Sequence, residues 1–176
     1  MIEAIKEHAA RFILRNRTAH KKFNKRNFSS VFQKSFSFLV LMPADDRDFR
    51  LSTPVLEYLK EQKKNIVVLT NDFRISLLPT YFKTNAVEYG IKDITKLKLP
   101  TRNIINKLTN MRFDVIIDLN REEEIFYTYI TKALNAPVKI GFVNSDSDNY
   151  FNMQIAHSKN GPEISYNNLL NCLKMF

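Results

Sequence analysis

A chain of 176 residues, 44% hydrophobic and 12% aromatic, is long and apolar enough to build one domain with a buried core. Its three glycines are too far apart for a GxGxxG or GxxxxGK loop, which excludes a standard dinucleotide or P-loop site, and its single cysteine, Cys172, excludes an internal disulfide and a cysteine-based zinc site. The formal net charge of +9 is concentrated at the start, because residues 1–35 hold nine Lys and Arg against Glu3 and Glu7, whereas residues 36–176 carry a net charge of only +2.

The first predicted element is a short amphipathic helix over residues 2–14, where apolar residues recur at helical spacing. Those residues are Ile2, Ile5, Ala9, Phe12 and Ile13. Residues 15–34 are basic, with interleaved phenylalanines and little core pattern, which is typical of an arm or linker. We therefore expect a basic helix and arm over residues 1–35, followed by a single domain over residues 36–176.

The domain is predicted to alternate strands with helices. Apolar runs indicate strands at 36–42, 65–70, 86–90, 113–119, 138–142 and 151–155. Helical patterns occupy 51–64, 75–84, 101–111, 121–134 and 162–176, and Thr53 is expected to cap the first of these helices after a loop over 43–50. This alternation predicts an α/β fold with a mostly parallel, Rossmann-like sheet of five or six strands and helices on both faces.

The clearest part of the pattern is the block FDVIIDLNREEEIFYTYITKALNAPVKIGF, residues 113–142. It has the order strand, loop, helix, turn and strand, which is a complete βαβ unit. Ligands of such folds bind beyond the carboxyl ends of the strands, near the point where the strand order reverses. The loops expected to hold a site are therefore 43–50, 71–74, 119–122 and 142–149.

Several of these segments carry a family resemblance. The stretch VLMPADDRDFRLSTPVLEYLKE, the strand FDVIIDL, the strand KIGF and the final helix PEISYNNLLNCLKMF occur in one order and at one spacing. Together they resemble the N-terminal, acceptor-side domain of the family 9 glycosyltransferases, the heptosyltransferases of lipopolysaccharide synthesis, over roughly residues 36–176. The resemblance implies a B-type half-fold in which Asp48 aligns with the general base that acts on the acceptor hydroxyl.

Two departures from that family weaken the expectation of its chemistry. The family has Gly-Asp in the loop after the first strand, and this chain has Arg47-Asp48, so a bulky cation replaces the residue that lets backbone approach a substrate. We also expect this protein to lack the C-terminal domain that binds the nucleotide-sugar in that family. We therefore expect no stand-alone enzyme and no cofactor.

The other polar candidates have structural readings as well as functional ones. Asp45, Asp46 and Asp48 form either a cation site or a solvated turn that favours the N-terminus of the next helix. Asp118 ends a strand, as a phosphoacceptor aspartate does, or simply lines the loop. The run Glu122–Glu124 is expected to form the solvated first turn of a helix. The histidines His8, His20 and His157 show no metal-ligand spacing, so no metal is expected.

The basic arm suits an anionic partner. Its cations would neutralise phosphates and its rings would stack on unpaired bases. The residues expected to bind nucleic acid are Arg11, Arg15, Arg17, Lys21, Lys22, Phe23, Lys25, Arg26 and Phe28. Two alternatives remain open: peripheral contact with an anionic membrane surface, or packing against the chain's own domain or a second copy.

The leading hypothesis is a non-catalytic binding module on a degenerate glycosyltransferase-like half-fold, whose arm engages RNA or a ribonucleoprotein. One alternative is an acceptor-binding subunit that completes a glycosyltransferase of envelope sugar synthesis with a second protein chain. Another is a structural or homo-oligomeric protein. The sequence has no run of about 18 apolar residues and no apolar segment of a secretory signal, and its lone cysteine fits a reducing compartment, so we expect a cytoplasmic protein without a transmembrane segment.

Overall fold

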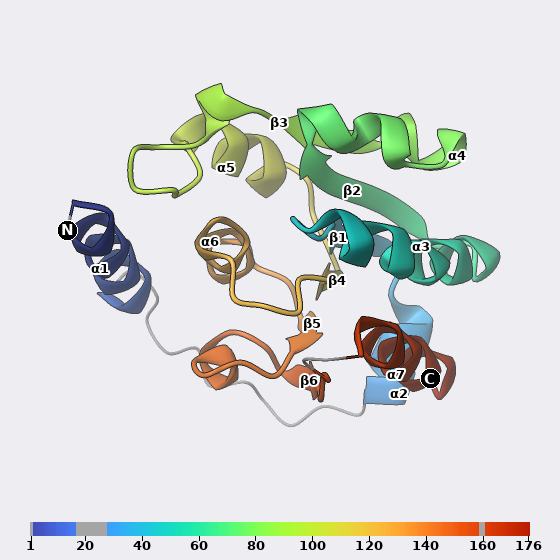
Figure 1. Cartoon of the computed structure of the whole chain (residues 1–176). Coiled ribbons are helices and arrows are strands. Elements are labelled where there is room, and N and C mark those ends of the chain that lie inside the picture. Colours follow the sequence, from blue (N-terminus) through green and yellow to red (C-terminus); the bar gives the residue numbers. More distant parts are fainter. Residues whose placement is uncertain (1, 17–27, 159–160) are drawn as a thin grey trace.

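A single sheet of six parallel strands forms the centre of the molecule (Figure 1). The computed structural model describes residues 2–16, 28–158 and 161–176. The strands are β1 (Ser37–Leu41), β2 (Asn65–Asn71), β3 (Ala86–Tyr89), β4 (Val115–Asp118), β5 (Val138–Phe142) and β6 (Met153–Ile155). Their spatial order is β3-β2-β1-β4-β5-β6, so the predicted Rossmann-like α/β fold is confirmed.

Helices cover both faces of this sheet (Figure 1). They are α1 (Ile2–Asn16), α2 (Phe28–Lys34), α3 (Asp46–Glu61), α4 (Thr80–Lys83), α5 (Arg102–Thr109), α6 (Ile125–Ala133) and α7 (Pro162–Lys174), with short 3₁₀ turns at Asp72–Leu77, Ile91–Asp93 and Ser147–Asn149. The elements α2, α3 and α7 share one core with the sheet, whereas α5 and α6 share the core of the opposite face. The alternation of side chains along each strand divides its residues between the two cores.

The central strands are buried on both faces, as continuous apolar runs predict for a parallel sheet. In β1, Phe38 and Val40 belong to the core under α3, and Leu39 and Leu41 belong to the core under α6. Phe38 lies in register with Ile66 of β2 and with Val115 of β4. The register places the carboxyl ends of β1 and β4 side by side.

Helix α3 begins five residues earlier than the sequence predicts. Asp45 is its N-cap, and the side chain accepts a hydrogen bond from the backbone N of Asp48 at 3.0 Å. The predicted cap, Thr53, is wrong, because it lies inside the helix with its hydroxyl 3.4 Å from the carbonyl of Phe49. The expected loop over 43–50 is therefore mostly helix, because an aspartate is as good an N-cap as a threonine and occurs earlier.

Helix α6 begins four residues later than predicted. It starts at Ile125 with Glu124 as its N-cap, so Glu122–Glu124 lie before the helix and not in its first turn. The chain before Glu122 is held in another conformation by the side chains of Asn120 and Arg121, which bond to Asp118 and Asp48. Tertiary contacts thus override the local preference for a helical start.

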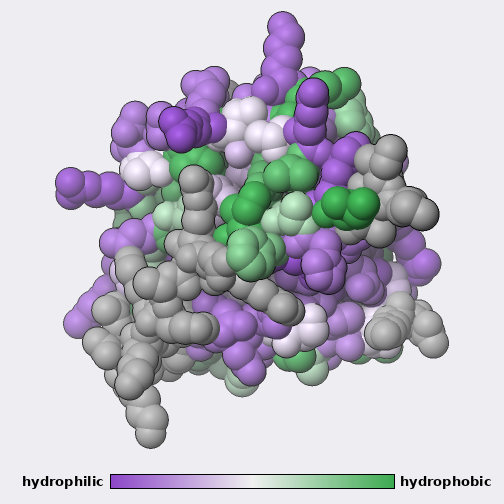
Figure 2. All heavy atoms as spheres, turned by 90° about the vertical axis from the view of Figure 1, so that its left-hand side faces the viewer, coloured by the Kyte–Doolittle hydropathy of each residue, from purple (hydrophilic) through white to green (hydrophobic). Residues whose placement is uncertain are grey.

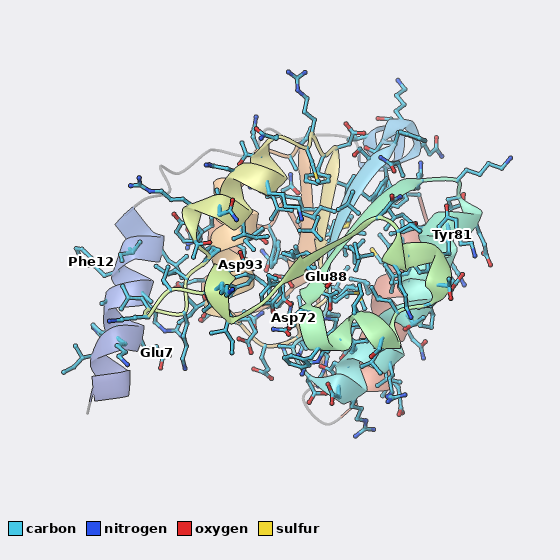
Figure 3. All side chains as sticks on the ribbon, turned by 90° about the horizontal axis from the view of Figure 1, so that it is seen from above. Glu7, Phe12, Asp72, Tyr81, Glu88 and Asp93 are labelled. Carbon is cyan, nitrogen blue, oxygen red and sulfur yellow. The ribbon has the colours of Figure 1, made fainter. Side chains whose placement is uncertain are left out.

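The N-terminal helix α1 packs on the domain through a face that overlaps the predicted one only in part, since Ile13 lies in the contact. Ala10 and Leu14 are buried against Leu99, whereas Ile5 and Phe12 are 64% and 65% exposed. Figure 2 views the side of the molecule on which α1 lies and shows a hydrophobic patch there, and in Figure 3 Phe12 points away from the domain. The expected apolar face is therefore wrong for these two positions.

Helix α2 joins the core of the domain. The ring of Phe32 is buried and packs edge-on against Phe38, with ring centroids 5.4 Å apart. The Lys64 ammonium donates to the carbonyls of Phe32 and Ser35, at 3.3 and 2.8 Å, and so caps the carboxyl end of α2. Residues ahead of position 36 thus contribute to the same core as the residues after it.

Gly141 in β5 is required by a close contact, which gives a first prediction. A Cβ at this position would lie 2.1 Å from Cζ of Phe151, inside the ring of a buried side chain. Gly141→Ala is expected to lower the free energy of unfolding by about 1–3 kcal/mol, as overpacking does, measured by urea denaturation. Gly161→Ala is the matched control, because its Cβ would meet only the ends of side chains, Cδ1 of Ile164 at 3.0 Å and Oγ of Ser158 at 3.3 Å. Equal stability of the two variants would contradict this account.

Candidate functional site

The place where this topology would hold a ligand lies between β1 and β4. The chain runs from β1 to β2 on one side, and β4 pairs with β1 on the other side, so the strand order reverses there. Two loops meet beyond the carboxyl ends of these strands: one follows Leu41 and the other follows Asp118. In doubly wound folds a ligand enters the crevice between two such loops.

Asn120 closes that crevice with its own hydrogen bonds. Its Oδ1 accepts from the backbone N of Ala44 at 2.9 Å, across the crevice. Its Nδ2 and its backbone N both donate to Oδ1 of Asp118, at 2.8 and 3.0 Å. Asn120 and Asp118 are buried. The two loops are thus joined by a polar side chain whose bonding groups are already used.

A buried ion pair lies next to Asn120. Arg121 donates from Nε to Oδ2 of Asp48 at 2.8 Å and from Nη2 to Oδ1 at 3.1 Å, and its Nη1 donates to the carbonyl of Ser158 at 3.1 Å. The side chains of Asp48 and Arg121 are only 8% and 13% exposed. This two-point pairing occupies both carboxylate oxygens of the residue that the glycosyltransferase resemblance assigns as a base.

The N-terminus of α3 is not suited to bind a phosphate. Asp45 caps it, and Asp46 in the first turn pairs with Arg74 at 2.8 Å. Carboxylates thus stand where a phosphate would need free backbone N–H groups. The three aspartates of this segment have three different partners, since Asp48 pairs with Arg121. Across the described residues no group of three or more His, Cys, Asp and Glu side chains could hold a metal ion.

Burial raises the pKa of several groups around the crevice. Burial raises the pKa of Asp118 to about 6, although its hydrogen bonds to Asn120 partly oppose the rise. Burial also raises the pKa of Glu124 and, well above its ordinary value, the pKa of Tyr127, whose hydroxyl lies 2.8 Å from that of Tyr89. Perturbed groups often mark functional sites. Here Asp118 is hydrogen-bonded to Asn120 and Tyr127 to Tyr89, so the hydrogen-bond partners of these two groups are protein side chains.

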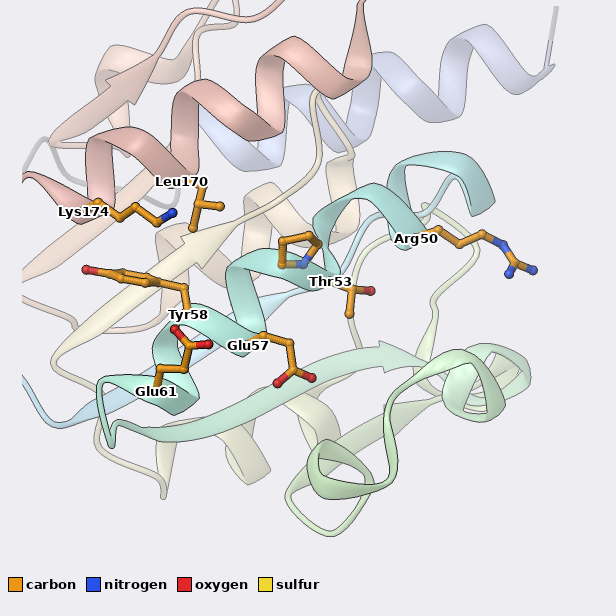
Figure 4. Close-up of a pocket in the computed structure, with 8 residues that line it drawn as sticks. Arg50, Thr53, Glu57, Tyr58, Glu61, Leu170 and Lys174 are labelled. Atoms are coloured by element: carbon orange, nitrogen blue, oxygen red, sulfur yellow. The ribbon is translucent and has the colours of Figure 1, made fainter.

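The described cavities lie elsewhere. One hollow of about 480 Å³ lies between α3 and α7, where Figure 4 shows Tyr58, Glu61 and Lys174 at one end and Arg50 at the other. A second hollow, of about 500 Å³, lies between α1 and α5 and is lined by Ile13, Leu99 and Tyr129 among others. Neither hollow borders the β1–β4 crevice, so the sheet topology and the cavities do not point to one site.

The residues expected to bind nucleic acid fall into two groups. Arg11 is described, and its guanidinium pairs with Glu123 at 2.7 Å and with Glu7 at 3.1 Å; the bond to Glu123 is the main cause that raises the pKa of Arg11. Arg11 therefore ties α1 to the domain. The side chains of Arg15, Arg17, Lys21, Lys22, Phe23, Lys25, Arg26 and Phe28 lie outside the described residues.

The excess positive charge of residues 1–35 is confined to a shorter stretch of the chain. In residues 1–14, Lys6 and Arg11 balance Glu3 and Glu7. Residues 15–34, here called the basic segment, hold seven Lys and Arg and no acidic residue. The segment starts after Leu14, which is buried in the α1 contact, and it ends in α2, whose Phe32 is in the core. A fully basic stretch is thus attached to the domain at both ends.

Sequence reasoning missed Asn120 and Arg121, the two residues that close the crevice. The loop over 119–122 was expected to matter, but neither residue type signalled a bridge, because their partners Ala44 and Asp48 lie 76 and 73 residues earlier. Among the described residues, no helix has the length and apolar character to cross a membrane. The compartment and the partners therefore stay predictions.

Comparison with known proteins gives a family without an assigned activity. A model described as "Family of unknown function (DUF6913)" matches residues 6–176, which includes most of α1, the basic segment and the whole domain. No curated protein and no solved structure shows a significant match.

Proposed function

The chain belongs to the DUF6913 family of unknown function, and we propose that it is a non-catalytic binding module whose basic segment engages RNA or a ribonucleoprotein. The observation that carries the proposal is the charge of the basic segment, seven cations without an acid, attached at both ends to a nearly neutral domain. Clustered Lys and Arg release counterions from a phosphate backbone, and interleaved rings stack on unpaired bases.

The state of the β1–β4 crevice supports a module without catalysis. Its one carboxylate with a family precedent, on Asp48, is held at both oxygens by Arg121. Asn120 joins the two loops between which a ligand would enter. Within the described residues, the Asp48 carboxylate and the Asn120 amide at this crevice already have protein partners, which favours a role in stability over one in catalysis.

The proposal is tested by neutralising the basic segment. The variant replaces five cations by glutamine, namely Arg17, Lys21, Lys22, Lys25 and Arg26. We expect binding of a short labelled single-stranded RNA, followed by fluorescence anisotropy, to weaken strongly at low salt. The slope of log affinity against log salt should fall by about 0.7 for each lost phosphate contact, because fewer counterions are released on binding.

A matched control removes the same charge from the domain. Its five positions are exposed cations outside the segment in the sequence: Lys83, Lys92, Lys96, Arg102 and Lys107. This control should keep most of the affinity and the salt slope. Equal losses in the two variants, or no RNA binding by the unmodified protein at low salt, would overturn the proposal.

The acceptor-subunit hypothesis and the homo-oligomer hypothesis stay predictions. The first requires an accessible Asp48 carboxylate, so activity of a purified two-chain complex that survives Asp48→Asn would contradict it. The second is checked by the molar mass in solution from light scattering.

A further inference from the structure

An exposed phenylalanine ring lies at the end of the sheet where the parallel strands begin, here called the amino-end edge. It belongs to Phe36, two residues after the basic segment. Phe36 lies between α2 and β1, and it is 62% exposed although its neighbours Ser35 and Phe38 are buried. Its backbone is fixed on both sides: the N donates to Oδ2 of Asp114 at 2.9 Å, and the carbonyl accepts from the N of Asn65 at 2.8 Å. The ring is thus held out from a rigid strand end.

Three exposed cationic residues lie close to this strand end in the chain or through their backbone, besides the half-buried Lys64 that caps α2. Lys34 is two residues before Phe36 in the chain. The carbonyl of Arg112 accepts from the Ser37 hydroxyl at 2.9 Å, which places Arg112 beside the start of β1. Lys63 follows α3 in the left-handed conformation, with φ of 56° and its N bonded to the carbonyl of Lys60 at 2.8 Å, and it lies two residues before Asn65.

These cations are available to a ligand. Lys34, Lys63 and Arg112 are exposed, and none of the three has an ion pair within the described part of the chain. The Asp114 carboxylate at the same strand end already accepts from the backbone N of Phe36 and of Ser37 at 2.9 Å each. This end of the sheet therefore carries an exposed ring and three exposed cationic residues close to it.

We propose that this edge is a stacking platform for single-stranded RNA, with Phe36 as the ring and Lys34, Lys63 and Arg112 as phosphate contacts. The inference rests on the proposed function and names the form of RNA and the surface of the domain that the basic segment would share. A protein ring can stack on an unpaired base, whereas the bases of a duplex stack on one another.

The opposite edge of the sheet shows why exposure of a ring is not enough. Phe73, after β2, is 67% exposed, but Arg74 already lies 4.6 Å from its ring centroid. Asp72 and Asp93 approach Gly90 nearby, and Figure 3 shows both on this side of the molecule. Carboxylates there would repel a phosphate backbone, so the charge selects the amino-end edge.

The test compares Phe36→Ala with Phe73→Ala, the matched control of equal chemistry at the other edge. Phe36→Ala is expected to weaken the affinity for single-stranded RNA roughly 5- to 150-fold, the usual loss when one base–ring stack is removed. The slope of log affinity against log salt should not change. Phe36→Trp should restore the affinity. Arg112→Gln should lower the slope by about 0.7 instead. Binding of a duplex of the same sequence should not respond to Phe36→Ala.

The outcomes separate this inference from the proposed function. If neutralising the basic segment abolishes binding but Phe36→Ala does not differ from Phe73→Ala, the platform is wrong and the proposed function stands. If single-stranded RNA does not bind at all, both are wrong. If anionic phospholipid vesicles bind the protein and RNA does not, the segment contacts a membrane surface and the platform is also overturned.

Discussion

Asp48→Ala is expected to lower the free energy of unfolding by about 3–5 kcal/mol, because it leaves the Arg121 guanidinium buried without its counter-ion. The Arg121 side chain is 13% exposed, and within the described residues its guanidinium would keep only the hydrogen bond to the carbonyl of Ser158. Urea denaturation at neutral pH measures the loss. A double variant, Asp48→Leu with Arg121→Met, should recover most of the stability, since it removes both charges together.

The neighbouring residue supplies the control. Arg47 pairs with Glu163 at 3.3 Å, but these side chains are 67% and 63% exposed. Arg47→Gln should therefore cost at most about 1 kcal/mol. Unchanged stability of Asp48→Ala would contradict a stabilising ion pair between Asp48 and Arg121.

The fold was predictable because each central strand is buried on both faces and therefore reads as a continuous apolar run. All six strands lie within two residues of the predicted bounds, including the short β6. The errors in the predicted helix bounds occur where hydrogen bonds of polar side chains determine the residue at which a helix begins. Asp45 starts α3 earlier than Thr53, and the partners of Asn120 and Arg121 delay α6. The start of α3 depends on a local choice between two possible caps, whereas the start of α6 depends on Ala44 and Asp48, which lie 76 and 73 residues earlier and are absent from a local pattern.

The candidate site was less predictable for the same reason. Asp48 was singled out, but its partner Arg121 was not, and this partner changes its role from an available base to half of a buried pair. The helical spacing of apolar residues in α1 could be recognised in the sequence, but it does not indicate which face packs on the domain. In the structure Ala10 and Leu14 are buried, whereas Ile5 and Phe12 are exposed. By contrast, the net charge of a segment can be counted without knowing the fold, so the basic segment could be located from the sequence alone.

Asp118→Asn is expected to stabilise the protein at pH 7.5 by up to about 3 kcal/mol and to have little effect near pH 4. The pKa of Asp118 is raised from 3.8 to about 6, chiefly by burial. Because the folded state holds this proton more tightly than the unfolded state, ionisation opposes folding increasingly as the pH rises from 3.8 to 6. Asparagine carries no charge, and its Oδ1 can still accept from both donors of Asn120.

The gain should therefore appear as a difference between unfolding curves recorded at pH 4 and at pH 7.5. Asp114→Asn, at the other end of β4, is the control, because its carboxylate accepts from two backbone N–H groups at 2.9 Å and should lose stability at pH 7.5 when its charge is removed. An Asp118→Asn variant that is less stable at pH 7.5 than the unmodified protein would contradict the expected gain and would show that the hydrogen bonds from Asn120 need an ionised acceptor.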